Sequence, residues 1–316
     1  MSRRLGFRTR KHKRNPAGEG ISLRGREGKP FRIALYCVVG VLFVFALLFL
    51  GRPKNQLMNS AEIRRITDRG VLVVGVRDDI PSFAYNGEGL EIELAKLFAE
   101  YLFPESGSET AVKLVTVSGQ TASTKLSDGS IDAAIALMPK GASSKYAYSY
   151  SYYTDSCRVA VRPGLENAPL DSINIGYVQN TAGASVLSSY IDEHETKVER
   201  TLLDRIKGRT PELPEDAVVF TKTAFASYPD MLKALSEGRI DGAAMTGVYI
   251  ERYAGEAELT LHNTPLGTVN YAIAVSADEP AIARLADVFI YELSQSGRLE
   301  ALLAKYGLSG GGKTGP

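Results

Sequence analysis

The segments DGSIDAAIAL (residues 128–137) and EGRIDGAAMT (237–246) decide the fold, because one pattern occurs twice in the chain. In each copy a Gly-x-Ile-Asp turn precedes a short apolar run of strand length. A helical pattern precedes each turn. This near-duplication predicts two lobes of the same construction.

Strand-like and helix-like segments alternate outward from the two copies. Before the first copy, the β-branched runs 71–76 and 112–117 are typical of strands, and residues 89–103 are apolar at the helical period. Further strands are predicted at 158–162, 172–178 and 217–222, and helices at 60–70, 182–191, 227–238 and 280–307. The alternation predicts an α/β fold with parallel sheets covered by helices. Ligands of such sheets bind beyond the carboxyl ends of the strands, so two facing lobes predict a ligand cleft between them.

The N-terminal 50 residues differ from the rest of the chain. Residues 33–50 contain no charge and no proline, and a helix of that length spans roughly 27 Å, close to the thickness of a bilayer core. Residues 1–32 hold 11 Lys or Arg and two acids. The positive-inside rule therefore predicts a cytoplasmic tail at 1–32, a transmembrane helix at 33–50, a stalk at 51–61 and an extracytoplasmic globular part at the inner membrane. A cleaved signal peptide is the alternative, but the long basic segment before the apolar run argues against it.

Charge and cysteine content exclude several classes of protein. After position 32 the chain has 26 basic and 34 acidic residues, which gives no basis for nucleic-acid binding. Cys37 lies in the apolar run and Cys157 in the globular part, so neither a disulfide nor a cysteine metal site is expected. The terminal GLSGGGKT (307–314) matches the phosphate-loop pattern but lacks the strand before it and the helix after it. We therefore expect no cofactor.

Six segments in order resemble the type II extracytoplasmic solute-binding proteins, in the amino-acid-binding family 3 branch. They are GVLVVGVRDDIPSFAY, GLEIELAKLFAEYL, LSDGSIDAAIALM, IGYVQNTAG, SYPDMLKALSEGRIDGAAMTG and SQSGRLEALLAKYG. The resemblance covers about residues 62–308. It implies two lobes joined by two crossing segments: lobe 1 at 62–162 plus 266–308, lobe 2 at 163–265, and a flexible tail at 309–316. It also implies hinged closure around a small polar solute.

The chain departs from this family at both charged contacts with an α-amino acid. The arginine that follows the family's M-T-x-T loop and holds the ligand carboxylate falls on Ala142 or Ser144. The acid that holds the ligand ammonium falls at about Thr246. Lys140 and Lys145 are close to the first position, but a lysine is a point charge and not a planar fork. These substitutions put an ordinary amino-acid ligand in doubt.

The candidate ligand-binding residues follow predicted strands or begin predicted helices near the cleft. Each also has a structural interpretation: aromatic residues in the core, an N-cap at Thr181 and solvated lysines. Asp132 and Asp241 are interpreted as structural because they lie at equivalent turns. The candidates are Phe83, Tyr85, Met138, Lys140, Lys145, Tyr152, Asn180, Thr181 and Thr246.

Three functions are compatible with the sequence. The first is a membrane-anchored solute-binding protein that supplies an ABC-type transporter permease. The second is a sensor or interaction module whose ligand site is lost or altered. The third is an enzyme of the dehydratase type, for which no catalytic motif is present. We therefore expect a binding protein and not an enzyme.

Overall fold

The computed structural model describes residues 53–106, 108–197, 214–255 and 259–308. The predicted transmembrane helix at 33–50 and the predicted tail at 309–316 lie outside the described residues. Within the described ranges, no helix has both the length and the apolar character needed to cross a membrane.

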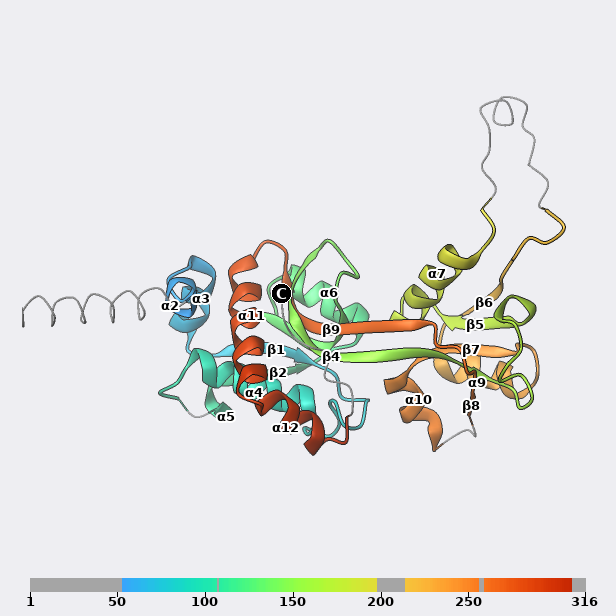
Figure 1. Cartoon of the computed structure of the whole chain (residues 1–316). Coiled ribbons are helices and arrows are strands. Elements are labelled where there is room, and N and C mark those ends of the chain that lie inside the picture. Colours follow the sequence, from blue (N-terminus) through green and yellow to red (C-terminus); the bar gives the residue numbers. More distant parts are fainter. Residues whose placement is uncertain (1–52, 107, 198–213, 256–258, 309–316) are drawn as a thin grey trace, which may run out of the picture. The chain divides into compact units, whose positions relative to one another are not determined.

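The described residues form two lobes of alternating strands and helices (Figure 1). The elements of the first lobe are α2 (Pro53–Leu57), α3 (Ala61–Arg69), β1 (Leu72–Val76), α4 (Leu90–Leu102), α5 (Ser108–Ala111), β2 (Val112–Thr116), α6 (Gly119–Ser127), β3 (Ala133–Pro139), α11 (Pro280–Gln295) and α12 (Arg298–Lys305). Those of the second are η1 (Leu170–Ser172), β5 (Asn174–Val178), α7 (Ala182–His194), β6 (Thr221–Phe225), α9 (Tyr228–Ser236), β7 (Gly242–Thr246), α10 (Gly247–Ala254) and β8 (Thr260–Leu261). Two long strands, β4 (Tyr146–Val161) and β9 (Gly267–Ser276), belong to both.

The strand order β2-β1-β3-β9-β4-β7-β5-β6 repeats one arrangement in the two lobes. In the first lobe β1 lies between β2 and β3, parallel to both. In the second lobe β5 lies between β6 and β7, also parallel to both. The strands that follow the two Gly-x-Ile-Asp turns, β3 and β7, therefore occupy equivalent places, as the duplication predicts.

The aspartates of these turns have equivalent hydrogen bonds. Val73 N donates to Asp132 Oδ2 at 2.8 Å, and Asn174 N donates to Asp241 Oδ2 at 3.0 Å. Each carboxylate also pairs with an arginine. Both turns thus fasten the start of the third strand to the start of the first strand, which confirms the structural interpretation of the two aspartates.

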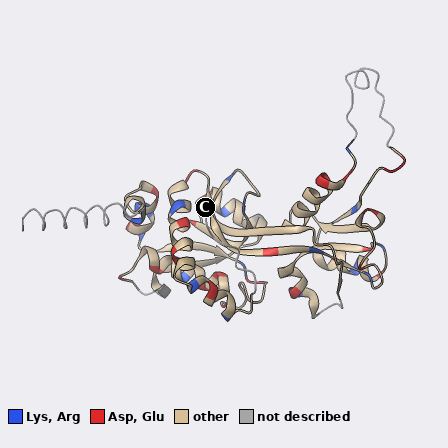
Figure 2. Cartoon of the chain, in the orientation of Figure 1, with Lys and Arg blue, Asp and Glu red and all other residues tan. Residues whose placement is uncertain are grey.

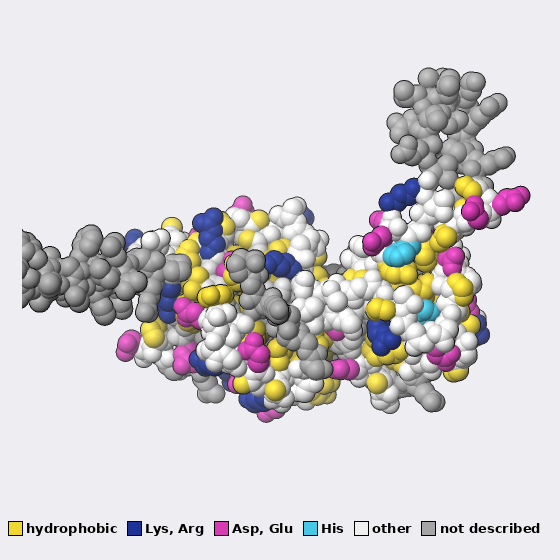
Figure 3. All heavy atoms as spheres, viewed as in Figure 1, with side chains coloured by type: hydrophobic (Ala, Val, Ile, Leu, Met, Phe, Trp, Pro, Cys, Tyr) yellow, Lys and Arg dark blue, Asp and Glu magenta, His cyan; other side chains and the backbone are white. Residues whose placement is uncertain are grey.

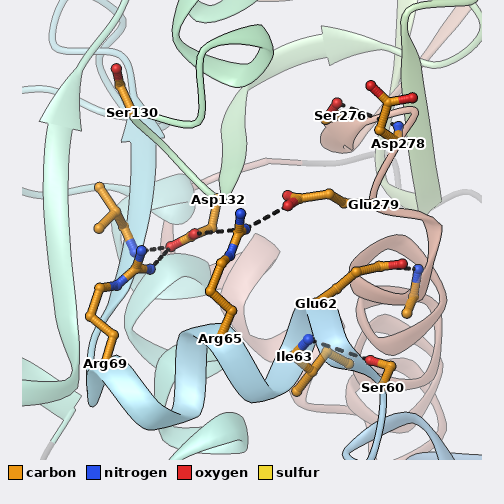
Figure 4. Close-up of polar contacts among 12 residues, drawn as sticks. Ser60, Glu62, Ile63, Arg65, Arg69, Ser130, Asp132, Ser276, Asp278 and Glu279 are labelled. Atoms are coloured by element: carbon orange, nitrogen blue, oxygen red, sulfur yellow. Dashed lines mark hydrogen bonds and ion pairs between the residues drawn. The ribbon is translucent and has the colours of Figure 1, made fainter.

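Helix α3 forms ion pairs with the first lobe through its charged face (Figure 4). Arg69 pairs with Asp132, and Arg65 Nη2 lies 2.6 Å from Glu279 Oε1 at the start of α11. Ser60 caps the helix by accepting from Ile63 N, and Gly70 ends it in the left-handed conformation. These two residues are the ends of the helix predicted at 60–70.

The core lies on both faces of each half of the sheet. In the first lobe α3, α4, α11 and α12 contribute to one apolar cluster and α6 to another. In the second lobe α7 packs on one face and α9 on the other. The inner parallel strands β1, β3 and β7 are therefore covered on both sides, which explains their apolar sequences.

Two connecting strands run from one half of the sheet to the other. Tyr146–Cys157 of β4 pairs antiparallel with β9, and Cys157–Val161 pairs with β7. Figure 2 shows both strands almost free of charge, and their charged residues are Asp155 and Arg158 on β4. The predicted strand at 158–162 is thus the end of a much longer strand. The strand predicted at 217–222 is shifted, because β6 occupies Thr221–Phe225.

Candidate solute-binding cleft

A hollow of about 650 Å³ lies between the lobes. Its walls come from the carboxyl ends of β1 and β3 and the start of α6 in the first lobe, and from the starts of α7 and α10 in the second. The lining residues include Arg77, Ser118, Gly119, Leu137, Met138, Ala142, Tyr146, Tyr148, Gln179, Asn180, Thr181, Ala182, Ser185, Tyr249 and Tyr271. The hollow therefore lies where an α/β sheet usually binds its ligand.

Two helix N-termini face this hollow from opposite lobes. Ser118 caps α6 by accepting from Thr121 N, and Thr181 caps α7 by accepting from Ala184 N. The earlier N–H groups of each helix have no partner within the helix, and they carry its positive dipole end. Both ends favour an anionic or strongly hydrogen-bond-accepting group between them.

Arg77 lies directly after β1, and its side chain is 14% exposed. Nε and Nη2 donate to the two carboxylate oxygens of Asp79 at 2.8 and 2.6 Å. The guanidinium carbon of Arg77 lies 5.8 Å from the ring centroid of Tyr249, a residue of α10 in the other lobe. Arg77 therefore lines the hollow and contacts a residue of each lobe.

A buried glutamate fixes the shape of the cleft at the end of β3. Glu91 Oε1 accepts from Leu137 N at 2.6 Å and from the Tyr152 hydroxyl at 2.5 Å. Leu137 has φ 50°, a left-handed conformation that is costly for a leucine, and the register between β3 and β9 shifts at this place. Burial raises the pKa of Glu91 to about 7, and its Oε2 has no hydrogen-bond partner among the described residues. Glu91 thus joins α4, β3 and the connecting strand β4 beneath the cleft.

The second lobe is fastened to the same connecting strand by an aspartate. Asp155 Oδ2 accepts from Val248 N at 3.0 Å, in the first turn of α10. A Cβ added at Gly247 would lie 2.4 Å from Asp155 Oδ1, so glycine permits this close approach. The start of α10, which carries Tyr249 into the cleft, is therefore positioned by β4.

The structure brings three of the predicted ligand residues together in the hollow: Met138, Asn180 and Thr181. Lys140 lines a neighbouring hollow of about 500 Å³, which shares Ala142 and Ser185 with the first. Phe83 and Tyr152 are each 1% exposed and belong to the core of the first lobe. Tyr85 and Lys145 are exposed and line neither hollow.

The two positions of the family's charged contacts carry no charge. Of the two positions on which the family's arginine falls, Ala142 lines the hollow and Ser144 does not. Thr246 is fully buried, and its Oγ1 accepts from the Tyr271 hydroxyl at 3.4 Å. No acid is present among the described residues that line the hollow, and Arg77 is the one charged side chain there.

Sequence reasoning missed Arg77 and three of the tyrosines, Tyr146, Tyr249 and Tyr271. Of the four tyrosines at 148–153, Tyr148 lines the hollow. A signal for Arg77 was present, because it is the first residue after a buried strand whose carboxyl end faces the expected cleft. No local pattern shows that its side chain turns inward.

Comparison with known proteins agrees with this architecture. The P235GK mutant of ArgBP from T. maritima has a similar fold, with 21% sequence identity, a TM-score of 0.56 and a match over 78% of this chain and 98% of that chain. The solute receptor for L-cysteine of Neisseria gonorrhoeae is similar at 18% identity and a TM-score of 0.57, over 77% of this chain and 92% of that chain. An amino acid ABC transporter substrate-binding protein from Streptococcus pneumoniae, bound to L-arginine, is similar at 18% identity and a TM-score of 0.56, over 79% of this chain and 100% of that chain. At these identities the likeness concerns the fold. The model of the bacterial extracellular solute-binding proteins, family 3, matches residues 72–309. The chain therefore belongs to the family 3 bacterial extracellular solute-binding proteins.

Proposed function

We propose that this protein is a membrane-anchored, extracytoplasmic receptor that binds a small polar solute between its lobes and presents it to an ABC-type transporter. The observation that carries the proposal is the hollow lined by both lobes, with a helix N-terminus from each lobe and Arg77 in its lining. A solute that bridges these groups stabilises the closed arrangement of the lobes. Family membership and the ABC-transport neighbours support the role.

Filling the hollow tests this function. We expect Ala142→Trp to abolish solute binding, because Ala142 is exposed and lines both hollows, so the indole occupies the space without disturbing the core. The measurement is thermal unfolding of the full-length chain against carboxylates, amino acids, sugars and polyamines, since a ligand at 100-fold its dissociation constant stabilises the folded state by about 2.7 kcal/mol.

Ala301→Trp is the matched control, because Ala301 is an exposed residue of α12 and lines neither hollow. It should respond to solutes as the wild-type chain does. A solute that stabilises both tryptophan variants equally well would place the binding site elsewhere. No response to any solute in the wild-type chain would contradict the receptor role and favour an interaction module.

Membrane anchoring rests on the sequence of residues 1–50. The chain should remain with the membrane pellet after alkaline carbonate washing, because an uncleaved apolar segment inserts in the bilayer. Deletion of residues 1–52 should release the protein to the soluble fraction. Intact mass spectrometry is the control, since a mass that lacks the N-terminal segment would show a cleaved signal peptide.

A further inference from the structure

We infer that the solute is a small carboxylate without an ammonium group, and that Arg77 binds its carboxylate. This inference rests on the proposed function and names the chemical class of ligand for the same cleft. Arg77 takes the role of the family's missing arginine from a different strand, because it comes from the end of β1 and not from the loop after β3.

The hydrogen bonds of Arg77 limit the charge of the ligand. Nε and Nη2 of Arg77 donate hydrogen bonds to Asp79, whereas Nη1 of Arg77 has no hydrogen bond to any described residue. The Arg77–Asp79 pair is close to neutral and offers no excess positive charge to a dianion such as phosphate, whereas a group with one negative charge can replace Asp79 on the guanidinium. Asp79 is 62% exposed, and a ligand carboxylate that displaced it would keep the bidentate geometry that arginine favours.

The lining of the hollow disfavours an ammonium group. An ammonium taken out of water needs an anionic partner or several acceptors to offset its lost hydration. No acid is found among the described lining residues, and Thr246 is buried against Tyr271. The two helix N-termini present donors and a positive dipole end, which repel a cation. An α-amino acid would therefore find no acidic partner for its ammonium among the described lining residues.

The remaining walls suit an uncharged body. Tyr146, Tyr148, Tyr249 and Tyr271 line the hollow, and their rings offer apolar faces with polar tips. The tyrosine hydroxyls and the Ser118 and Ser185 side chains can bond a hydroxyl or keto oxygen beside the carboxylate. Short hydroxy acids and keto acids, with or without an aromatic group, fit this description.

Matched pairs of solutes separate the carboxylate from the ammonium. We would titrate the full-length chain in mild detergent with lactate and alanine, and with phenyllactate and phenylalanine, by calorimetry. In at least one pair the hydroxy acid should bind about tenfold tighter or more, as expected when a charged group is left unpaired. Equal or tighter binding of the amino acid in both pairs would overturn the inference. Inorganic phosphate binding more tightly than both hydroxy acids would also overturn it.

Variants of the Arg77–Asp79 pair should move the affinity in opposite directions. Arg77→Gln should weaken hydroxy-acid binding about ten- to hundredfold, because a charge-assisted bidentate contact is lost. Arg77→Lys should lose less of the affinity for the hydroxy acid than Arg77→Gln. Asp79→Asn should increase this affinity above that of the wild type, because the competing carboxylate is removed. Arg239→Gln is the control, since Arg239 is exposed and pairs with Glu237 on the surface.

The outcomes distinguish the inference from the proposed function. An unchanged affinity in Arg77→Gln, or a weaker one in Asp79→Asn, would overturn the role of Arg77 even if the lobes bind a solute. Binding of sugars or amines but of no carboxylate would leave the receptor role intact and overturn the ligand class. The absence of any bound solute in the wild-type chain would overturn both.

Discussion

Replacing Gly89 with alanine should lower the free energy of unfolding by about 3–5 kcal/mol, because two separate penalties coincide at this residue. Gly89 has φ 126°, a conformation that L side chains rarely adopt, and an added Cβ would lie 2.3 Å from the carbonyl oxygen of Phe83. That carbonyl accepts from Glu91 N at 2.8 Å in the first turn of α4. The substitution therefore displaces the loop after β1 and the start of α4 together.

Gly87 provides a control within the same loop. Its φ is 77°, and no atom lies within 4 Å of a Cβ added there. Gly87→Ala should cost about 1–2 kcal/mol, which is the conformational penalty alone. Urea unfolding of both variants measures the difference through their midpoints. Equal losses in the two variants would show that the close approach of Gly89 to Phe83 is not a constraint on the fold.

Replacing Glu91 with glutamine should remove most of the pH dependence of stability between about pH 5 and pH 7.5. Burial raises the pKa of Glu91 from 4.5 to about 7. Between these values the folded protein keeps the proton that the unfolded chain releases, so the free energy of unfolding decreases as pH rises. For a shift of this size the decrease is about 3 kcal/mol. Glutamine mimics the protonated carboxyl and has no charge to bury, so at pH 8 the variant should be more stable than the wild type by roughly that amount.

Glu93 is a matched control because it lies in the same turn of α4. Partial burial opposes ionisation there, but hydrogen bonds from Lys305 and Tyr306 lower the pKa of Glu93 overall. The contribution of Glu93 to the free energy of unfolding is therefore present above its unfolded pKa and is lost as pH falls. This pH dependence has the opposite sign to that of Glu91. Glu93→Gln should be slightly less stable than the wild type at pH 8, by less than about 1 kcal/mol. Chemical unfolding at several pH values measures the stability of both variants. If the stability of Glu91→Gln changed with pH as steeply as that of the wild type, the raised pKa of Glu91 would be contradicted.

Elements with local signals could be predicted from the sequence. Ser60 and Gly70 define α3, and the apolar period defines α4. The repeated Gly-x-Ile-Asp turns predict β3 and β7 in equivalent places, and in each lobe the aspartate of the turn accepts a hydrogen bond from the start of the first strand. These features depend on residues close in sequence or on a repeated pattern, which explains why they can be predicted.

Elements defined by distant contacts could not be predicted. Strand β4 begins in a Tyr/Ser-rich stretch whose extended form depends on pairing with β9, more than 100 residues later. Helix α10 was missed, because its first turn is bonded to Asp155, which precedes it by 93 residues. Glu91 resembles an ordinary acid in the first turn of a helix, and its bonds to Leu137 and Tyr152 link segments far apart in the chain. The shape of the cleft therefore depends on tertiary contacts.

Figure 3 shows acidic and basic side chains intermixed on the visible face of both lobes. An intermixed surface of this kind does not focus a field of one sign over a wide area. Under the proposed function, selection of the solute would then depend on the few groups inside the cleft. Arg77 and the helix starts at Ser118 and Thr181 are those groups.

The most direct test of solute binding between the lobes is the distance between them with and without a solute. Spin labels on cysteines introduced at Asp128 in the first lobe and Lys233 in the second, both exposed, with Cys37 replaced by serine, report this distance by pulsed electron resonance in the full-length chain. Saturation with lactate or phenyllactate should move the distribution to a single shorter distance, and Ala142→Trp should abolish the shift. A distribution that stays unchanged while calorimetry shows the solute bound would contradict closure of the two lobes around it.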